Sequence, residues 1–365
     1  MLKKELTAAL VVLGALAPFA AQADQSNAQP TFLQGEKVKE GQLPAGYNQS
    51  AHYMCEDAWD VSFTADYLYW KLSADMDEVA TLITTSSSGV AAAFNGIGTT
   101  VSVDPTYKSG FQVGMGLDLK GMDNWNLYGE YTWYQNKTHK SVTAADGQIL
   151  VIGDDLRPAR YELLSVEDLS ARYRLHYNAA DLSIQRSFYN GKKLTADFGV
   201  GLRGLWLSQH YKLNAGGLAF AEVDASSFTS ESGTLAVKRE LQSWALGPRF
   251  TLGSNWLLGC GFRFMGDLAA SVLYTRYTEK DQSAVSSLTN LSISEPSNYN
   301  TLRAITETSL GLGWGSYLGQ KNDFHLDLSA SYEFNVFWNQ SISDMNGGHG
   351  NFYLQGLNVA ARFDF

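Results

Sequence analysis

The chain has 365 residues, of which 45% are hydrophobic, 18% are charged and 34 are glycine. This composition excludes an intrinsically disordered chain, which has fewer apolar and more charged residues. The 37 acidic residues outnumber the 27 basic ones, giving a net charge of −10. Because binding to phosphate backbones needs a basic surface, we expect no nucleic acid among the partners.

The N-terminal segment has the features of a secretory signal peptide. A short positive start precedes an apolar run over residues 10–20 and Ala21-Gln22-Ala23, which fits a small-residue cleavage site. The run is shorter than the roughly 20 residues that a transmembrane helix needs. We predict a signal peptide over residues 1–23, cleaved after Ala23, then a periplasmic leader over 24–57 and a barrel over 58–365.

From about residue 59 onward, apolar and polar side chains alternate with a period of two, as in strands whose faces meet different surroundings. The last segment is the clearest, because Leu357, Val359 and Phe363 share one face while Asn358 and Arg362 share the other. Ten strands are predicted, with approximate limits 59–72, 109–120, 125–137, 169–188, 194–210, 241–252, 260–278, 302–318, 324–338 and 351–365.

The connections between these strands alternate in length. The short ones are 121–124, 189–193, 253–259 and 319–323, and they contain turn residues. The long, polar ones are 73–108, 138–168, 211–240, 279–301 and 339–350. This alternation is typical of an all-β, transmembrane, antiparallel up-and-down barrel with tight turns at one end. The count rises from ten strands to twelve if residues 79–85 and 149–152 pair as a further hairpin element.

A secreted β-sandwich is the alternative fold, but charges such as Arg249 and Glu333 at central strand positions would need extensive pairing in a sealed core. The apolar face fits lipid instead. Aromatic residues near strand ends predict a girdle at the headgroups: Tyr67, Tyr69, Trp125, Trp133, Tyr173, Trp206, Trp244, Tyr274 and Trp314. In the fourth strand the apolar parity changes between Tyr177 and Leu182, which predicts a bulge near residues 178–180.

The polar face then defines the residues that line the lumen. The predicted pore-lining charges are Asp66, Asp118, Glu130, Asp197, Arg203, Arg249, Arg263, Asp267, Arg303, Glu307, Asp327, Glu333 and Arg362. They either set ion preference, as charged pore linings do, or neutralise one another and hold a narrow barrel open or shut. Ten strands enclose a narrow lumen, so the solutes expected are ions and small molecules.

The chain has two cysteines and six histidines, which are candidates for a disulfide, a metal site or catalysis. Cys55 and Cys260 map to the periplasmic end, and a disulfide between them requires their Cα atoms to approach within about 7 Å. Unpaired thiols and intermolecular bridges are the alternatives. His139, His210 and His349 fall at loop bases, but no metal-ligand spacing such as H-E-x-x-H occurs. We expect no enzyme, no catalytic or metal site and no cofactor.

Several strand motifs carry a family resemblance. They are Ala65-Asp66-Tyr67-Leu68-Tyr69-Trp70-Lys71, Tyr177-Asn178-Ala179-Ala180-Asp181-Leu182, Gly199-Val200-Gly201-Leu202-Arg203-Gly204-Leu205-Trp206, Trp244-Ala245-Leu246-Gly247-Pro248-Arg249, Leu268-Ala269-Ala270-Ser271-Val272-Leu273-Tyr274 and Tyr332-Glu333-Phe334-Asn335-Val336-Phe337-Trp338-Asn339-Gln340. The chain resembles the Legionella-type major outer membrane protein family, also found in environmental relatives of chlamydiae. The resemblance implies a pore-forming barrel of the Gram-negative outer membrane and assigns no active site.

The expected function is therefore that of a porin, a narrow water-filled channel for passive diffusion of ions and small solutes. The alternative is a surface adhesin or structural barrel with a closed lumen. Outer-membrane lipid is an expected partner. The barrel assembly machinery is another, since outer-membrane barrels end in an aromatic residue like Phe365. A homo-oligomer is left open, because nothing in the chain fixes its oligomeric state.

Overall fold

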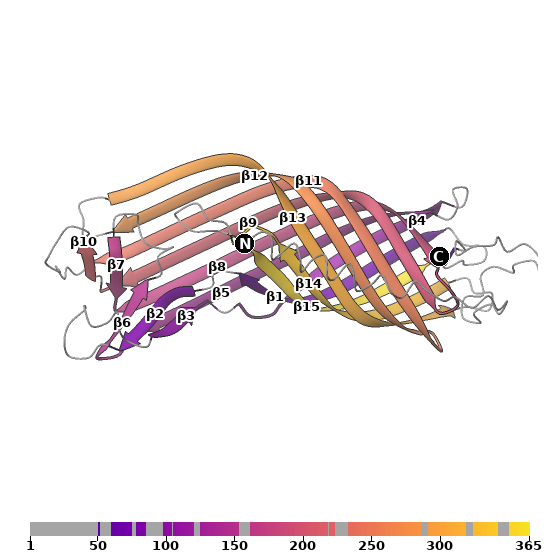
Figure 1. Cartoon of the computed structure of the whole chain (residues 1–365), viewed down its shortest axis with the longest axis horizontal. Coiled ribbons are helices and arrows are strands. Elements are labelled where there is room, and N and C mark those ends of the chain that lie inside the picture. Colours follow the sequence, from indigo (N-terminus) through magenta and orange to yellow (C-terminus); the bar gives the residue numbers. More distant parts are fainter. Residues whose placement is uncertain are drawn as a thin grey trace, which may run out of the picture.

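The computed structural model describes residues 50–51, 60–74, 78–84, 98–103, 105–119, 125–152, 161–217, 219–222, 233–285, 291–318, 324–341 and 350–365. Ten strands close into an antiparallel barrel in the order β1-β15-β14-β13-β12-β11-β9-β8-β5-β4 (Figure 1). They are β1 (Val61–Ala74), β4 (Lys108–Leu119), β5 (Trp125–Thr143), β8 (Asp168–Tyr189), β9 (Leu194–Gly216), β11 (Thr234–Gly259), β12 (Phe262–Val285), β13 (Leu291–Leu318), β14 (Phe324–Phe337) and β15 (Phe352–Asp364). The predicted ten-stranded barrel is confirmed. The predicted signal peptide lies outside the described residues, and so does the predicted leader apart from Ser50 and Ala51.

The barrel closes where its first and last strands meet. β1 pairs with β15 over thirteen residue pairs, from Ser62 with Asp364 to Ala74 with Phe352. The C-terminal ring of Phe365 lies 6.0 Å from the ring of Phe63, centroid to centroid. A closed ring of paired strands satisfies the backbone hydrogen-bonding groups that an open edge would leave exposed to lipid.

The two ends of the barrel differ. β11, β12 and β13 have 26, 24 and 28 residues, whereas about 9–11 residues of tilted strand cross a bilayer. These strands therefore extend far beyond one side of the membrane, which we call the long-loop end. At the opposite, short-turn end, β11 runs to Gly259 and not to residue 252 as predicted. The turn there is Cys260-Gly261, with φ of 52° and 82°, values that match the twist of two-residue hairpins.

A second sheet lies at the long-loop end (Figure 1). Its strands are β2 (Glu78–Thr84), β3 (Gly98–Ser102), β6 (Gln148–Ile152), β7 (Tyr161–Val166) and β10 (Ala219–Glu222), in the order β10-β7-β6-β2-β3. The two segments predicted as a further hairpin element do pair, as β2 with β6, but in this sheet and not in the barrel. Its buried Val79, Leu150 and Ile152 share a core with Leu213 and Leu235 of the extended barrel strands.

Large apolar side chains cover the outer face of the barrel below these extensions. Leu202 is 54% exposed, Phe250 52% and Leu302 66%. Soluble monomers rarely expose contiguous apolar areas of this kind, so this belt is the lipid-facing surface. Trp206 and Trp244 of the predicted girdle face outward and are also about half exposed. No helix among the residues that the model describes is long and apolar enough to cross a membrane.

Two sequence predictions about β8 are wrong. Its register is unbroken from Asp168 to Gln185 with β5 and from Asp168 to Tyr189 with β9, so there is no bulge near residues 178–180. Tyr173 is not part of the girdle: it packs on both buried apolar clusters, and its hydroxyl donates to Gln209 Oε1 at 2.7 Å. The apolar residues change from one face of β8 to the other because the surroundings change along the strand. Toward the long-loop end the inner face packs in an apolar core, and the outer face lies beyond the lipid.

Candidate functional site

The part of the lumen near the short-turn end contains a cavity of about 430 Å³. Eleven of the thirteen predicted lumen charges line it: Asp66, Glu130, Asp197, Arg203, Arg249, Arg263, Asp267, Glu307, Asp327, Glu333 and Arg362. The other two are outside its lining. Asp118 accepts a hydrogen bond from Asn126, and Arg303 donates to the hydroxyl of Tyr277 at 3.4 Å with its guanidinium over that ring.

Four charged side chains on one side of the cavity form a closed network. Arg203 donates to both carboxylate oxygens of Asp181, at 2.7 and 2.6 Å, and to Glu307 Oε1 at 2.5 Å. Arg249 donates to the other oxygen of Glu307 and lies 3.8 Å from Asp181. The Arg203 side chain is 3% exposed and that of Asp181 is 7%. Two cations and two anions therefore compensate one another, as buried charges require.

A second ion pair lies nearer the short-turn end. Arg263 donates to both carboxylate oxygens of Asp327, one of them at 2.7 Å. Its Nε also donates to Asn255 Oδ1 at 3.0 Å. A Cβ on Gly313 would lie 2.6 Å from the guanidinium carbon of Arg263, so this lumen-facing glycine accommodates a side chain and does not widen the passage.

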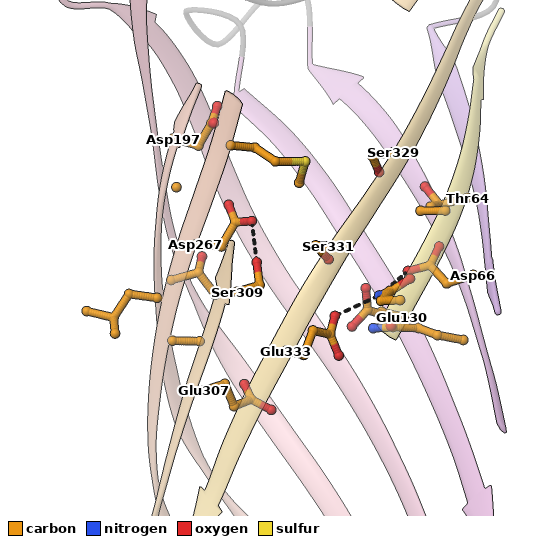
Figure 2. A pocket seen from close by; sticks show the side chains of 18 of the residues that line it. Thr64, Asp66, Glu130, Asp197, Asp267, Glu307, Ser309, Ser329, Ser331 and Glu333 are labelled. Atoms are coloured by element: carbon orange, nitrogen blue, oxygen red, sulfur yellow. Dashed lines mark hydrogen bonds between the residues drawn. The ribbon is translucent and has the colours of Figure 1, made fainter. Parts of the chain in front are cut away.

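The opposite side of the cavity is acidic. Asp66, Glu130 and Glu333 converge there (Figure 2), and the side-chain amide of Asn358 donates to Glu333 at 2.7 Å and to Asp66 at 3.2 Å. On the side of β12 and β13, Asp267 accepts from Ser309 at 2.9 Å (Figure 2). In all, seven carboxylates and four arginines line the cavity. The lining therefore carries more carboxylates than guanidinium groups.

Above the cavity the lumen is filled by a set of buried apolar side chains, which we call the apolar layer. Its members are Leu68, Trp70, Leu72, Tyr134, Leu175, Tyr177, Ala179, Leu205, Leu207, Ala245, Leu273, Ile305, Phe337, Phe352 and Leu354. Every barrel strand except β4 contributes to it. None of these side chains is more than 4% exposed, a degree of burial typical of a close-packed protein interior. The sequence prediction did not include this layer.

Contacts within the apolar layer cross the lumen. Tyr177 on β8 and Phe337 on β14 have ring centroids 5.6 Å apart, although these strands lie five places apart in the ten-strand order, on opposite walls. Phe337 also stacks on Phe352 at 4.2 Å. A polar contact crosses as well, because Gln209 donates to the backbone oxygen of Gln340 at 2.6 Å. The lumen is therefore closed at this level.

These features define an outer-membrane β-barrel: a closed antiparallel barrel, an outward apolar belt, and charged side chains that face the lumen at the height of that belt. A family model described as "Legionella pneumophila major outer membrane protein precursor" matches residues 54–365. The chain belongs to this family, and the predicted resemblance and outer-membrane location are confirmed.

Solved structures of outer-membrane barrels are similar at low identity. The outer membrane protease OmpT of Escherichia coli is 10% identical, with a TM-score of 0.40, covering 84% of this chain and 96% of the other. The Pseudomonas putida toluene transporter TodX is 11% identical, with a TM-score of 0.23, covering 84% and 89%. An anion-selective porin from Comamonas acidovorans is 10% identical, with a TM-score of 0.15, covering 82% and 100%. No curated protein matches the chain.

The histidines considered for catalysis are not gathered at one place. His139 and His210 lie on the outer face of extended strands, and His210 is 3.7 Å from the carboxylate of Glu240. His349 lies outside the described residues. Within the described ranges no group of three or more His, Cys, Asp or Glu side chains is arranged to hold a metal ion.

Cys260 gives a direct test of barrel orientation. It is exposed in the turn between β11 and β12, and short turns of outer-membrane barrels face the periplasm. In intact cells carrying a Cys55→Ser variant, a membrane-impermeant maleimide is expected to leave Cys260 unlabelled until the outer membrane is permeabilised. Labelling of intact cells would place the short-turn end outside. Cys55 lies outside the described residues, so its pairing with Cys260 stays a prediction.

Proposed function

We propose that this chain is an outer-membrane barrel whose lumen is closed at rest. Its role is then that of a structural barrel or surface adhesin, and not that of a channel through which ions and small solutes diffuse continuously. The contact between Tyr177 and Phe337 across the lumen carries this proposal. Side chains packed as in a protein interior leave no room for hydrated ions. No enzymatic step is proposed.

A narrow diffusion pore is the second candidate. It is favoured by the cavity of about 430 Å³, whose seven carboxylates and four arginines resemble the lining of a channel more than a sealed core. For this function the apolar layer has to move aside. The two candidates therefore differ in whether the resting state conducts.

Single-channel recording of the full refolded protein in a planar bilayer, under a salt gradient, distinguishes them. We expect a folded barrel, verified by heat-dependent gel mobility, that shows no sustained conductance steps at low voltage. Discrete steps with a stable reversal potential would contradict the closed resting state and favour the pore.

A further inference from the structure

We infer that the outer face of the barrel, just beyond its tryptophan girdle at the long-loop end, binds the phosphate groups of an anionic glycolipid of the outer leaflet. The inference rests on the chain being an outer-membrane barrel and is independent of whether its lumen conducts. It begins with a row of register partners. Trp133 pairs with Asn178, Asn178 with Trp206 and Trp206 with Trp244, which places three tryptophans in one register row across four adjacent strands.

Two rows farther along the same strands, the outward side chains become basic. Lys137 pairs with Arg174 and Arg174 with His210. In the next row, Arg172 pairs with Lys212 and Lys212 with Lys238. The six Lys and Arg residues of these rows, which we call the basic band, are Lys137, Arg172, Arg174, Lys212, Lys238 and Lys280.

The basic band stands out against the rest of the molecule. The chain has a net charge of −10. Among the described residues that pair in these two rows, however, Glu240 is the single acidic one. Glu240 accepts a hydrogen bond from Lys238 at 2.6 Å, which holds the pKa of this carboxyl, beyond the lipid belt, below its ordinary value. The other five cations therefore form a positive surface on an acidic protein.

The location of the basic band, next to the tryptophan girdle, indicates that its ligand is a lipid headgroup. His210 follows Trp206 by four residues on β9, about 13 Å along the strand and less along the membrane normal because barrel strands tilt. Tryptophans of a girdle lie at the headgroup level. Long Lys and Arg side chains reach back toward headgroups from such positions, and guanidinium and ammonium groups are the usual phosphate donors.

The test compares a variant of the band with a matched control. Arg172→Gln with Lys212→Gln removes two neighbouring cations of the band, and Lys192→Gln with Lys193→Gln removes two cations from the short β8–β9 turn at the other end. Each full-length barrel, refolded in neutral detergent, is titrated with bis-phosphorylated lipid A, with dephosphorylated lipid A and with inorganic phosphate. Tryptophan fluorescence reports binding, and heat-dependent gel mobility verifies folding.

We expect at least a tenfold loss of affinity for bis-phosphorylated lipid A in the band variant and less than a twofold change in the control. Three results would overturn the inference. Equal affinity for dephosphorylated lipid A would assign binding to the apolar belt. Binding of inorganic phosphate at similar concentrations would indicate a free-anion site. An equal loss in both variants would indicate an effect of net charge alone.

Discussion

Replacing both Tyr177 and Phe337 with alanine is expected to convert a silent barrel into a conducting one. The two rings meet across the lumen at 5.6 Å, and their removal opens the apolar layer between the cavity and the long-loop end. Each truncation of a buried aromatic ring also costs about 3–5 kcal/mol of stability. Planar-bilayer recording should show sustained steps that are absent from the unmodified protein. If the double variant does not fold, each single variant should show shorter openings.

The reversal potential of this opened variant should indicate preference for cations. Seven carboxylates and four arginines line the cavity through which the ions then pass, and a negative lining lowers the energy of cations. The matched control is Tyr332→Ala with Phe334→Ala. These residues lie on the same strand as Phe337, but face lipid with exposures of 50% and 39%. Equal conductance of the opened variant and this control would show that the apolar layer is not the barrier.

Replacing Glu307 with glutamine is expected to lower the stability of the barrel by about 3–5 kcal/mol. Glu307 accepts from both Arg203 and Arg249, so its neutralisation leaves two buried guanidinium groups with Asp181 as their acidic partner in the network. Urea unfolding of the protein in lipid vesicles, followed by tryptophan fluorescence, measures this loss.

Glu333→Gln is the matched control for this substitution. Glu333 lines the same cavity, and its contact is a hydrogen bond accepted from the amide of Asn358 at 2.7 Å, which a glutamine carbonyl can still accept. Adding Arg249→Met to Glu307→Gln removes the excess cation and should recover much of the loss, a coupling that a double-mutant cycle measures. A small effect of Glu307→Gln, equal to that of Glu333→Gln, would mean that water compensates the charges.

The sequence predicted the barrel strands well because lipid and lumen impose a strict alternation on residues that cross the membrane. It also predicted the charged residues that line the cavity, since side chains such as Arg203, Glu307 and Asp327 occupy the polar parity of their strands. It failed where the strands leave the membrane. There the inner face becomes apolar and the outer face polar, so the same alternation continues with the environments exchanged.

This exchange of surroundings between the two faces explains why the sequence did not predict the apolar layer. Alternation with a period of two shows that a strand has two different faces, but it does not show which face meets lipid, water or a core at each height. The available signal was the presence of Leu68, Trp70 and Leu72 on the parity assigned to the polar lumen. The partners of these side chains come from strands far away in the chain, which local patterns cannot identify.

The second sheet ties three separate long connections together. β2 and β3 belong to the connection after β1, β6 and β7 to the one after β5, and β10 to the one after β9. The connection after β5 pairs with both others, through β6 with β2 and through β7 with β10. These three connections therefore form one structural unit: lengthening or cutting one of them within its strands is expected to disturb the pairing of the other two, whereas the turn at Gly147 lies between β5 and β6 and should tolerate change.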